Sequence, residues 1–211
     1  MSEKFIITIA RQYGSGGKTI GQMLARRLGI PCYNREIITM ASEDSGINAV
    51  LFSDERLKPD LLSRLRSRYQ SRGGKPVSPE EGGFTNEDNL FEYQAKIIRQ
   101  LADEGPCVMI GRCADFVLRE RKDVARVFVH APDDFCLQEA LKVDSLPERE
   151  VKKKIAEVDA YRAAYYRRYT GQEWKDARNY DLSLNSAVLG FEGTVEAIAR
   201  YLETRAQFQT N

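Results

Sequence analysis

A short glycine-rich turn near the N-terminus ends in a lysine and a threonine, and these residue types suit the binding of phosphate. The turn and its polar residues read Gly14-Ser15-Gly16-Gly17-Lys18-Thr19. Glycines allow main-chain N–H groups to approach phosphate oxygens closely. The Lys18 ammonium would then reach the β- and γ-phosphates of ATP, and the Thr19 hydroxyl would ligate Mg²⁺. This spacing predicts that the segment binds a nucleoside triphosphate together with magnesium.

The segments on either side of this turn are those that a phosphate-binding loop requires. Phe5–Ala10 is an apolar run typical of a buried strand. After the turn, apolar residues recur at helical spacing, at Ile20, Met23, Leu24 and Leu28. The start of that helix would add about half a positive charge beside the phosphate. The usual pattern, G-x-x-x-x-G-K-[ST], has glycine where this chain has Gln12, so the alternative is a glycine-rich turn with an exposed lysine.

Arginines gather in a second segment, where they alternate with tyrosines. Transfer of a phosphoryl group needs positioning and positive charge around the phosphate oxygens. Arg162 and Arg167 lie on a predicted helix and would supply that charge as catalytic residues of a lid. Asp159 precedes Arg162 by three positions, so the two side chains share a helix face and would pair. The alternative is a solvated basic helix whose tyrosines pack on the core.

Four further polar residues come shortly after predicted strands. Asn34 and Arg35 follow a very short strand, and Arg112 and Asp115 follow the buried run 107–110. In open α/β sheets ligands bind beyond the carboxyl ends of the strands. We therefore expect these residues to hold a second substrate, the phosphoryl acceptor. The alternatives are a helix cap by Asn34 with Arg35 exposed, and an Arg112 that pairs with a surface carboxylate.

Length and composition indicate one soluble α/β domain. The chain has 211 residues, of which 42% are hydrophobic and 30% are charged. Its formal net charge of +1 argues against a large nucleic-acid surface. No apolar run is long enough for a membrane helix, and the N-terminus lacks the apolar stretch of a secretory signal. The four cysteines contain no C-x-x-C pair, so a reducing cytoplasm is the expected compartment.

Strands and helices are predicted to alternate along the chain. Apolar runs predict strands at 5–10, 31–33, 107–110, 124–130 and 181–185. Helices are predicted at about 36–45, 51–69, 89–102, 147–169 and 192–205, and an irregular loop at 71–86. Ser145 and Glu148 have the spacing of a capping box at the start of the helix at 147–169. The alternation predicts a parallel sheet with helices on both faces.

Taken together, these motifs resemble the cytidylate kinase-like family of P-loop nucleoside monophosphate kinases. The segments that carry the resemblance are 9–17, 110–115, 127–132, 165–171 and 180–182. The resemblance implies a three-layer α/β P-loop kinase fold, with a five-stranded parallel sheet in the order 2-3-1-4-5, helices on both faces and a helical lid. It also implies a single kinase domain over residues 1–211, divided into a core (1–33, 103–150, 178–211), an acceptor-binding insertion (about 34–102) and a lid (about 159–174).

The resemblance further implies roles for three arginines. Arg112 would hold the acceptor nucleotide, and Arg162 and Arg167 would bridge the donor and acceptor phosphates. Two segments differ from true cytidylate kinases. Asn34-Arg35-Glu36 stands where they carry Asp-Ser-Gly, and Cys113-Ala114 separates Gly111-Arg112 from Asp115. Both differences lie where the acceptor base and sugar are read, so the acceptor stays open.

We therefore expect an ATP- and Mg²⁺-dependent phosphotransferase whose acceptor is a nucleoside monophosphate such as CMP or dCMP. One alternative is a kinase that acts on the hydroxyl of a sugar or metabolite. That reaction recruits a carboxylate near the acceptor, for which Asp115 is the candidate. A second alternative is a regulatory protein that binds ATP without turnover. The expected partners are small molecules rather than nucleic acids or membranes, and the sequence leaves the oligomeric state open.

Overall fold

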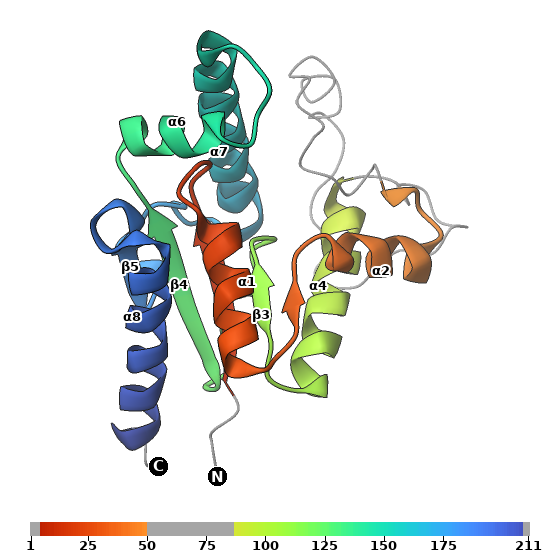
Figure 1. Ribbon diagram of the computed structural model, residues 1–211. Helices are drawn as coiled ribbons and strands as arrows, with labels where there is room; N and C mark the ends of the chain where they lie inside the picture. The colour runs from red at the N-terminus through yellow and green to blue at the C-terminus, as the bar shows by residue number, and fades with distance from the viewer. Residues whose placement is uncertain (1–4, 50–86, 209–211) are drawn as a thin grey trace.

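The computed structural model describes residues 5–49 and 87–208. Its centre is a parallel sheet of five strands, β1 (Ile6–Arg11), β2 (Cys32–Tyr33), β3 (Val108–Ile110), β4 (Val124–His130) and β5 (Leu182–Asn185). The strands lie in the order β2-β3-β1-β4-β5, which confirms the order implied by the resemblance. Because every pairing is parallel, the carboxyl ends of all the strands lie at one edge of the sheet (Figure 1).

Helices cover both faces of this sheet (Figure 1). One face carries α1 (Gly17–Leu28) and α8 (Ser186–Phe208), and α8 bends at Gly190. The other face carries α4 (Glu87–Glu104) and the short α5 (Ala114–Val117), with α2 (Glu36–Ser45) packed on α4. Beyond the carboxyl ends of the strands stand α6 (Asp133–Leu141) and α7 (Glu148–Thr170), and a single 3-10 turn, η2 (Ala177–Asn179), precedes β5.

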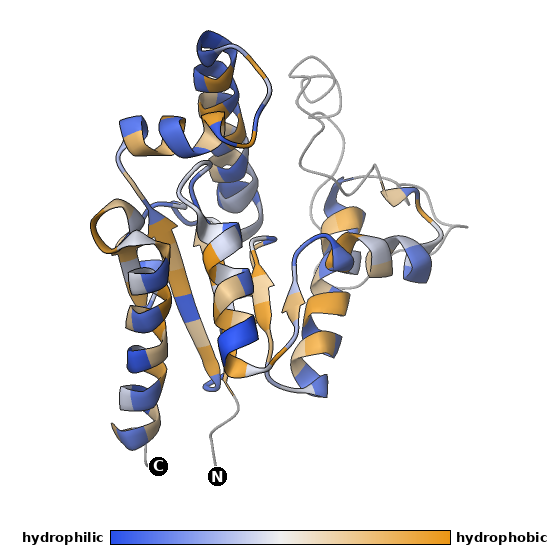
Figure 2. Ribbon diagram, in the orientation of Figure 1, coloured by the Kyte–Doolittle hydropathy of each residue, from blue (hydrophilic) through white to orange (hydrophobic). Residues whose placement is uncertain are grey.

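The central strand β1 is buried on both faces. Ile7 and Ile9 belong to the apolar cluster beneath α1 and α8, and Ile6 and Ala10 belong to the cluster beneath α4. None of these four side chains is more than 6% exposed. Burial of each large aliphatic side chain contributes about 1.5–3 kcal/mol. The apolar strands and the polar outer surfaces of the helices are visible in Figure 2. This burial fixes the turn after β1 at the centre of the row formed by the carboxyl ends of the strands.

The structure contains helices that the sequence interpretation lacked, and one local prediction was wrong. Helix α6 was not predicted, because its apolar and polar residues are not separated onto opposite faces. The capping box at Ser145 and Glu148 does not form, since α7 begins after Pro147 without a side-chain cap. The predicted helix at 51–69 and the loop at 71–86 lie outside the described residues. Within residues 5–49 and 87–208, no helix is long and apolar enough to cross a bilayer.

Candidate active site

The loop between β1 and α1 adopts a conformation that glycine accepts and other residues resist. Gly14 and Gly16 have φ angles of 79° and 76°. A Cβ atom at Gly14 would lie 2.2 Å from the carbonyl oxygen of Cys136, and one at Gly16 would lie 2.2 Å from the ring of Phe191. Glycine is therefore required at both positions, by the backbone dihedral and by the available space.

Replacing Gly14 with alanine should destabilise the protein more than the same change at Gly29. Both residues have positive φ, 79° and 65°, so each variant incurs about 1 kcal/mol of left-handed strain. A new Cβ at Gly14 meets backbone, whereas nothing lies within 4 Å of one at Gly29. We expect losses in the free energy of unfolding of about 2–4 kcal/mol for Gly14→Ala and about 1 kcal/mol for Gly29→Ala, measured by urea denaturation. Equal losses would contradict this loop geometry.

Hydrogen bonds to the neighbouring strands hold the loop in place. The buried hydroxyl of Ser15 lies 2.9 Å from the carbonyl oxygen of Gln12 and 3.1 Å from that of Val129. The Ser186 hydroxyl donates to the carbonyl oxygen of Ser15 at 2.7 Å. Gln12 accepts the N–H of Ala131 through its Oε1 atom at 3.2 Å. Its backbone φ is not positive, so glycine is not needed at this position of the motif.

The first turn of α1 is open to an anion. The helix begins after Gly16 without a side-chain cap, and its first turn holds no acidic residue. Lys18 and Thr19 follow in that turn, and their side chains are exposed. The N–H groups and the positive end of the helix dipole attract anions at such a terminus. The loop therefore has the backbone geometry and the charge that a phosphate group requires.

Helix α7 is hydrogen-bonded to this loop at two points. The Asp159 carboxylate accepts the N–H of Tyr13 at 2.8 Å and the Nη1 of Arg162 at 3.3 Å, which confirms the pairing expected from their spacing. The Nη1 of Arg162 also donates to the carbonyl oxygen of Arg11 at 3.1 Å. Burial raises the pKa of Asp159, although the bonds from Tyr13 and Arg162 oppose that shift. The segment predicted as a lid thus lies against the glycine-rich loop.

The Tyr13 side chain makes a further link between this loop and α7. Its hydroxyl donates to the Oδ2 of Asp144 at 2.8 Å, just beyond the end of α6. Lys154, in α7, donates to the Oδ1 of the same carboxylate at 2.5 Å, and its ammonium lies 5.3 Å from the centre of the Tyr13 ring. Tyr13 therefore links the loop to the connection between α6 and α7 and to α7 itself.

The chain after β3 turns through three consecutive left-handed residues. Gly111, Arg112 and Cys113 have φ angles of 75°, 62° and 53°. Residues other than glycine seldom adopt such angles, and each costs about 1 kcal/mol or more. This turn brings both Arg112 and the following Asp115 to the same pocket.

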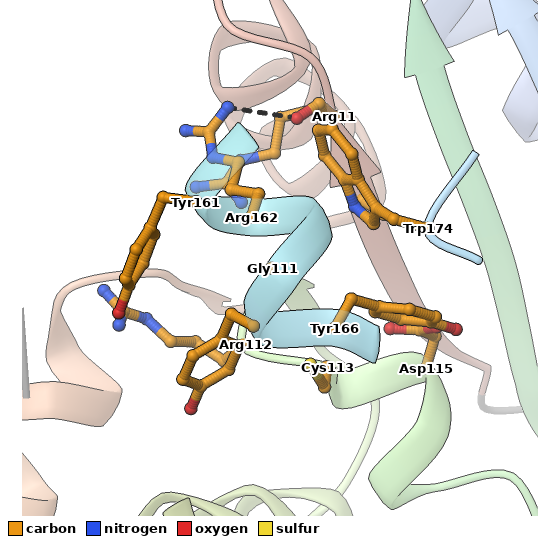
Figure 3. A pocket seen from close by; sticks show the side chains of 11 residues that line it. Arg11, Gly111, Arg112, Cys113, Asp115, Tyr161, Arg162, Tyr166 and Trp174 are labelled. Atoms are coloured by element: carbon orange, nitrogen blue, oxygen red, sulfur yellow. Dashed lines mark hydrogen bonds between the residues drawn. The ribbon is translucent and has the colours of Figure 1, made fainter. Parts of the chain in front are cut away.

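That pocket, of about 30 Å³, lies where β1, β3 and α7 meet (Figure 3). Three arginines from separate elements line it, Arg11, Arg112 and Arg162. The remaining wall is largely aromatic and includes Tyr161, Tyr165, Tyr166 and Trp174. The volume admits one small chemical group rather than a whole nucleotide. Arginine side chains therefore border, beside the glycine-rich loop, a space suited to a single anionic group.

A buried carboxyl also borders the pocket. Asp115 is 4% exposed, and its Oδ2 accepts the hydroxyl of Tyr166 at 2.7 Å. Burial raises the pKa of Asp115, while the bond from Tyr166 opposes the shift. The Asp115 carboxyl consequently binds a proton more readily than an exposed aspartate would.

The sequence matches the model of one protein family over most of its length. The model of the cytidylate kinase-like family matches residues 6–188, from β1 to the first turn of α8. The chain belongs to the cytidylate kinase-like family. This match spans the glycine-rich loop, the arginine-lined pocket and α7. A search of curated proteins returned no match.

Solved structures show the same fold at low sequence identity. An uncharacterized protein from Eubacterium ventriosum superposes with a TM-score of 0.71 at 20% identity, covering 96% of this chain and 100% of that one. A shikimate kinase from Bacteroides thetaiotaomicron gives 0.55 at 14% identity, with 95% and 99% covered. A gluconokinase from Sinorhizobium meliloti gives 0.53 at 15%, and both chains are fully covered, at 100%. The cytidylate kinase-like chain thus has the fold of P-loop kinases.

Some predicted site residues of this cytidylate kinase-like protein lie away from the pocket. Arg167 is 66% exposed and pairs with Glu173. Asn34 donates its N–H to Glu36 at 2.7 Å, and Arg35, rather than Asn34, occupies the N-cap position of α2. The alternative of an Asn34 cap is therefore wrong. None of Asn34, Arg35 and Arg167 lines the pocket formed by the described residues. Their roles in the reaction stay predictions.

Other residues at the site had no assigned role in the sequence interpretation. Arg11 lines the pocket, and Tyr13 joins the loop to α7. The sequence motif gave no reason to select Arg11, because this residue precedes the glycine-rich turn and no position of the motif there requires a charged residue. Its position at the carboxyl end of the central strand was the available signal, since ligands bind at that edge of such sheets.

Proposed function

We propose that this protein transfers the γ-phosphoryl group of ATP to a nucleoside monophosphate such as CMP or dCMP. The observation that carries the proposal is the junction between the glycine-rich loop and the arginine-lined pocket. The hydrogen bond from Arg162 to the carbonyl oxygen of Arg11 joins the arginine-lined pocket to the strand that leads into the glycine-rich loop. A donor phosphate on the loop and an acceptor phosphate in the pocket would then lie side by side.

The residues divide between the two substrates. The main-chain N–H groups of residues 14–19 would bind the ATP phosphates, and Lys18 would stabilise the charge that develops on the transferred group. Arg112 and Asp115 would contact the acceptor, and Arg162 would lie between both phosphates. No general base is required, because the acceptor is already a phosphate oxyanion. We propose that Asn34 and Arg35 contact the acceptor beyond this pocket and that Arg167 approaches only when the lid moves.

A magnesium ion fits the donor side of this arrangement. Within the part of the chain that the structure describes, no three His, Cys, Asp or Glu side chains converge to hold a metal ion by themselves. Magnesium commonly takes only one or two protein ligands, with phosphates and water completing its shell. The exposed Thr19 hydroxyl would provide such a ligand. When bound, the ion would neutralise negative charge on the ATP phosphates.

The proposal is tested by ATP consumption with a panel of acceptors. Nucleoside monophosphates and metabolite alcohols would each be supplied with ATP and magnesium, and ADP formation compared with the rate in water alone. We expect CMP and dCMP to give the highest turnover. If neither exceeds the water rate, the cytidylate assignment fails, and turnover with an alcohol would identify the phosphotransferase as a hydroxyl kinase.

The buried Asp115 carboxyl favours that second candidate, a kinase acting on a hydroxyl. A carboxylate bordering the acceptor pocket could take the proton of an attacking alcohol. Shikimate kinase and gluconokinase share the fold, so it accommodates hydroxyl acceptors. The two candidates differ in what they require of Asp115, and this difference can be measured.

Replacing Asp115 with asparagine separates the two candidates. If the acceptor is a monophosphate, Asp115→Asn should change kcat less than about tenfold, since no base is used. If the acceptor is an alcohol, kcat should fall by about 10²–10⁴, the usual contribution of a general base. Steady-state kinetics with the best acceptor of the panel gives the answer. A large loss with CMP would contradict the monophosphate proposal.

The free energy of unfolding of the wild type, compared with that of Asp115→Asn, should depend on pH. The folded pKa of Asp115 lies above its unfolded value, so its stabilising contribution is complete below the unfolded pKa and is lost as pH rises through the folded pKa. The free energy of unfolding of the wild type, relative to Asp115→Asn, should therefore fall as pH rises over that interval. Urea denaturation of both proteins from pH 4 to pH 8 measures this difference. A difference independent of pH would contradict the raised pKa.

A further inference from the structure

The side chain of Arg11 follows a path that two glycines leave open. A Cβ atom at Gly17 would lie 2.4 Å from the Cβ and 2.9 Å from the Cγ of Arg11. A Cβ atom at Gly111 would lie 2.2 Å from the Nη1 of Arg11 and 3.0 Å from its Cζ. The base of the side chain thus passes one glycine and the guanidinium passes another. Any other residue at either position would displace it.

This path directs the Arg11 guanidinium to the pocket. Arg11 is the last residue of β1, and Gly111 follows the neighbouring strand β3, with its N–H bonded to the carbonyl oxygen of Ile9 at 3.0 Å. The close parallel pairing of the two strands therefore places the guanidinium of one beside the left-handed turn of the other. Arg112 belongs to that same turn and also lines the pocket (Figure 3).

Three guanidinium groups from three elements would bind an anion more specifically than one. Arg11 comes from β1, Arg112 from the turn after β3, and Arg162 from α7. Arginine pairs bidentately with phosphate oxygens, and a phosphate monoester at neutral pH carries most of a second negative charge. A carboxylate carries one negative charge and offers two oxygens, so it would pair with fewer of these guanidinium groups than a phosphate monoester would. The number and charge of the arginines therefore favour a phosphate monoester.

We propose that Arg11 is a specificity-determining ligand for the acceptor, and that it selects an acceptor carrying a terminal phosphate monoester. The proposal rests on the phosphotransferase function above and adds to it the residue that would recognise the phosphate of the acceptor. It assigns Arg11 to the acceptor, although the residue directly precedes the loop that would bind ATP. Gly17 and Gly111 leave the space through which the Arg11 side chain reaches the pocket.

The experiment compares Arg11→Gln and Arg11→Lys with the wild type. Calorimetry would measure binding of CMP, of cytidine, and of methyl phosphate, a monoester without base or sugar. We expect Arg11→Gln to weaken CMP and methyl phosphate by about 10- to 100-fold, with ATP and cytidine each changed by less than about threefold. Arg11→Lys should weaken the two monoesters by a smaller factor, because it keeps the charge and loses the planar fork.

Two further variants distinguish an effect on the Arg11 side chain from a general loss of folding. Gly111→Ala keeps all three arginines but places a methyl group where the guanidinium lies, so it should weaken methyl phosphate as Arg11→Gln does. Gly29→Ala has a similar positive φ and open space around it, and it should leave binding unchanged. Thermal unfolding of every variant would show that each is folded.

The outcomes separate this inference from the proposed function. If folded Arg11→Gln binds CMP and methyl phosphate as the wild type does, or loses ATP equally, the assignment of Arg11 is overturned. Tighter binding of acetate than of methyl phosphate to the wild type would overturn the substrate class. If methyl phosphate binding depends on Arg11 but no nucleoside monophosphate is turned over, the inference stands and the nucleotide acceptor is wrong.

Discussion

Replacing Lys18 with methionine should lower kcat for phosphoryl transfer by about a thousandfold. Lys18 stands in the first turn of α1, immediately after the uncapped N-terminus that would bind the phosphates. Its ammonium would stabilise charge on the transferred group as that charge develops, and removal of one such contact typically costs about 10²–10³ in kcat. Methionine keeps the length and helix propensity of the side chain but removes the charge. Steady-state assays with saturating ATP and acceptor measure the change.

A matched control lies on the solvent face of α7. Lys153 is 76% exposed and pairs across one turn with Glu157, so Lys153→Met makes the same chemical change outside the loop. Its kcat should stay within about twofold of the wild type, since surface substitutions rarely matter. Similar activities for the Lys18 and Lys153 variants, both folded by circular dichroism, would refute the placement of phosphates on this loop.

Replacing Arg162 with alanine should lower transfer by about 10³-fold or more while ATP affinity changes only a few-fold. Arginines that approach the transferred phosphoryl group contribute about 10³–10⁵ to the rate in enzymes of this chemistry. Arg162 is placed for that role, because its guanidinium is bonded to the Arg11 carbonyl oxygen between the loop and the pocket. A protein that only binds ATP would not need it. Titration with ATP and a single-turnover assay together measure the two effects.

The same variant should also be less stable. Arg162 bonds to the Arg11 carbonyl oxygen at 3.1 Å and to Asp159 at 3.3 Å, and its side chain is 15% exposed. Loss of these bonds should reduce the free energy of unfolding by about 1–3 kcal/mol. Arg200→Ala removes an exposed arginine paired with Glu196 and serves as the control. If Arg162→Ala loses ATP binding in proportion to turnover, its role is structural rather than catalytic.

The sequence by itself determined the parts of this protein whose geometry is local. The glycine-rich turn could be identified because its N–H groups, its left-handed glycines and the helix start all come from consecutive residues. The strands β1 and β4 could be predicted because continuous apolar runs suit burial on both faces. Gln12 stands at a motif glycine position without backbone strain, since its φ is not positive.

Only the tertiary structure decided which arginines share a site. Arg11 and Arg162 meet across 151 positions of sequence, through a hydrogen bond that no local pattern encodes. Arg162 and Arg167 both belong to the basic segment, yet five helical positions place them about 140° apart around the axis, so they cannot face the loop together. Arg11 reaches the pocket because two glycines, one in each of two segments far apart in sequence, leave room for its side chain. A side chain's neighbours depend on how the strands pair, and pairing is a property of the whole fold.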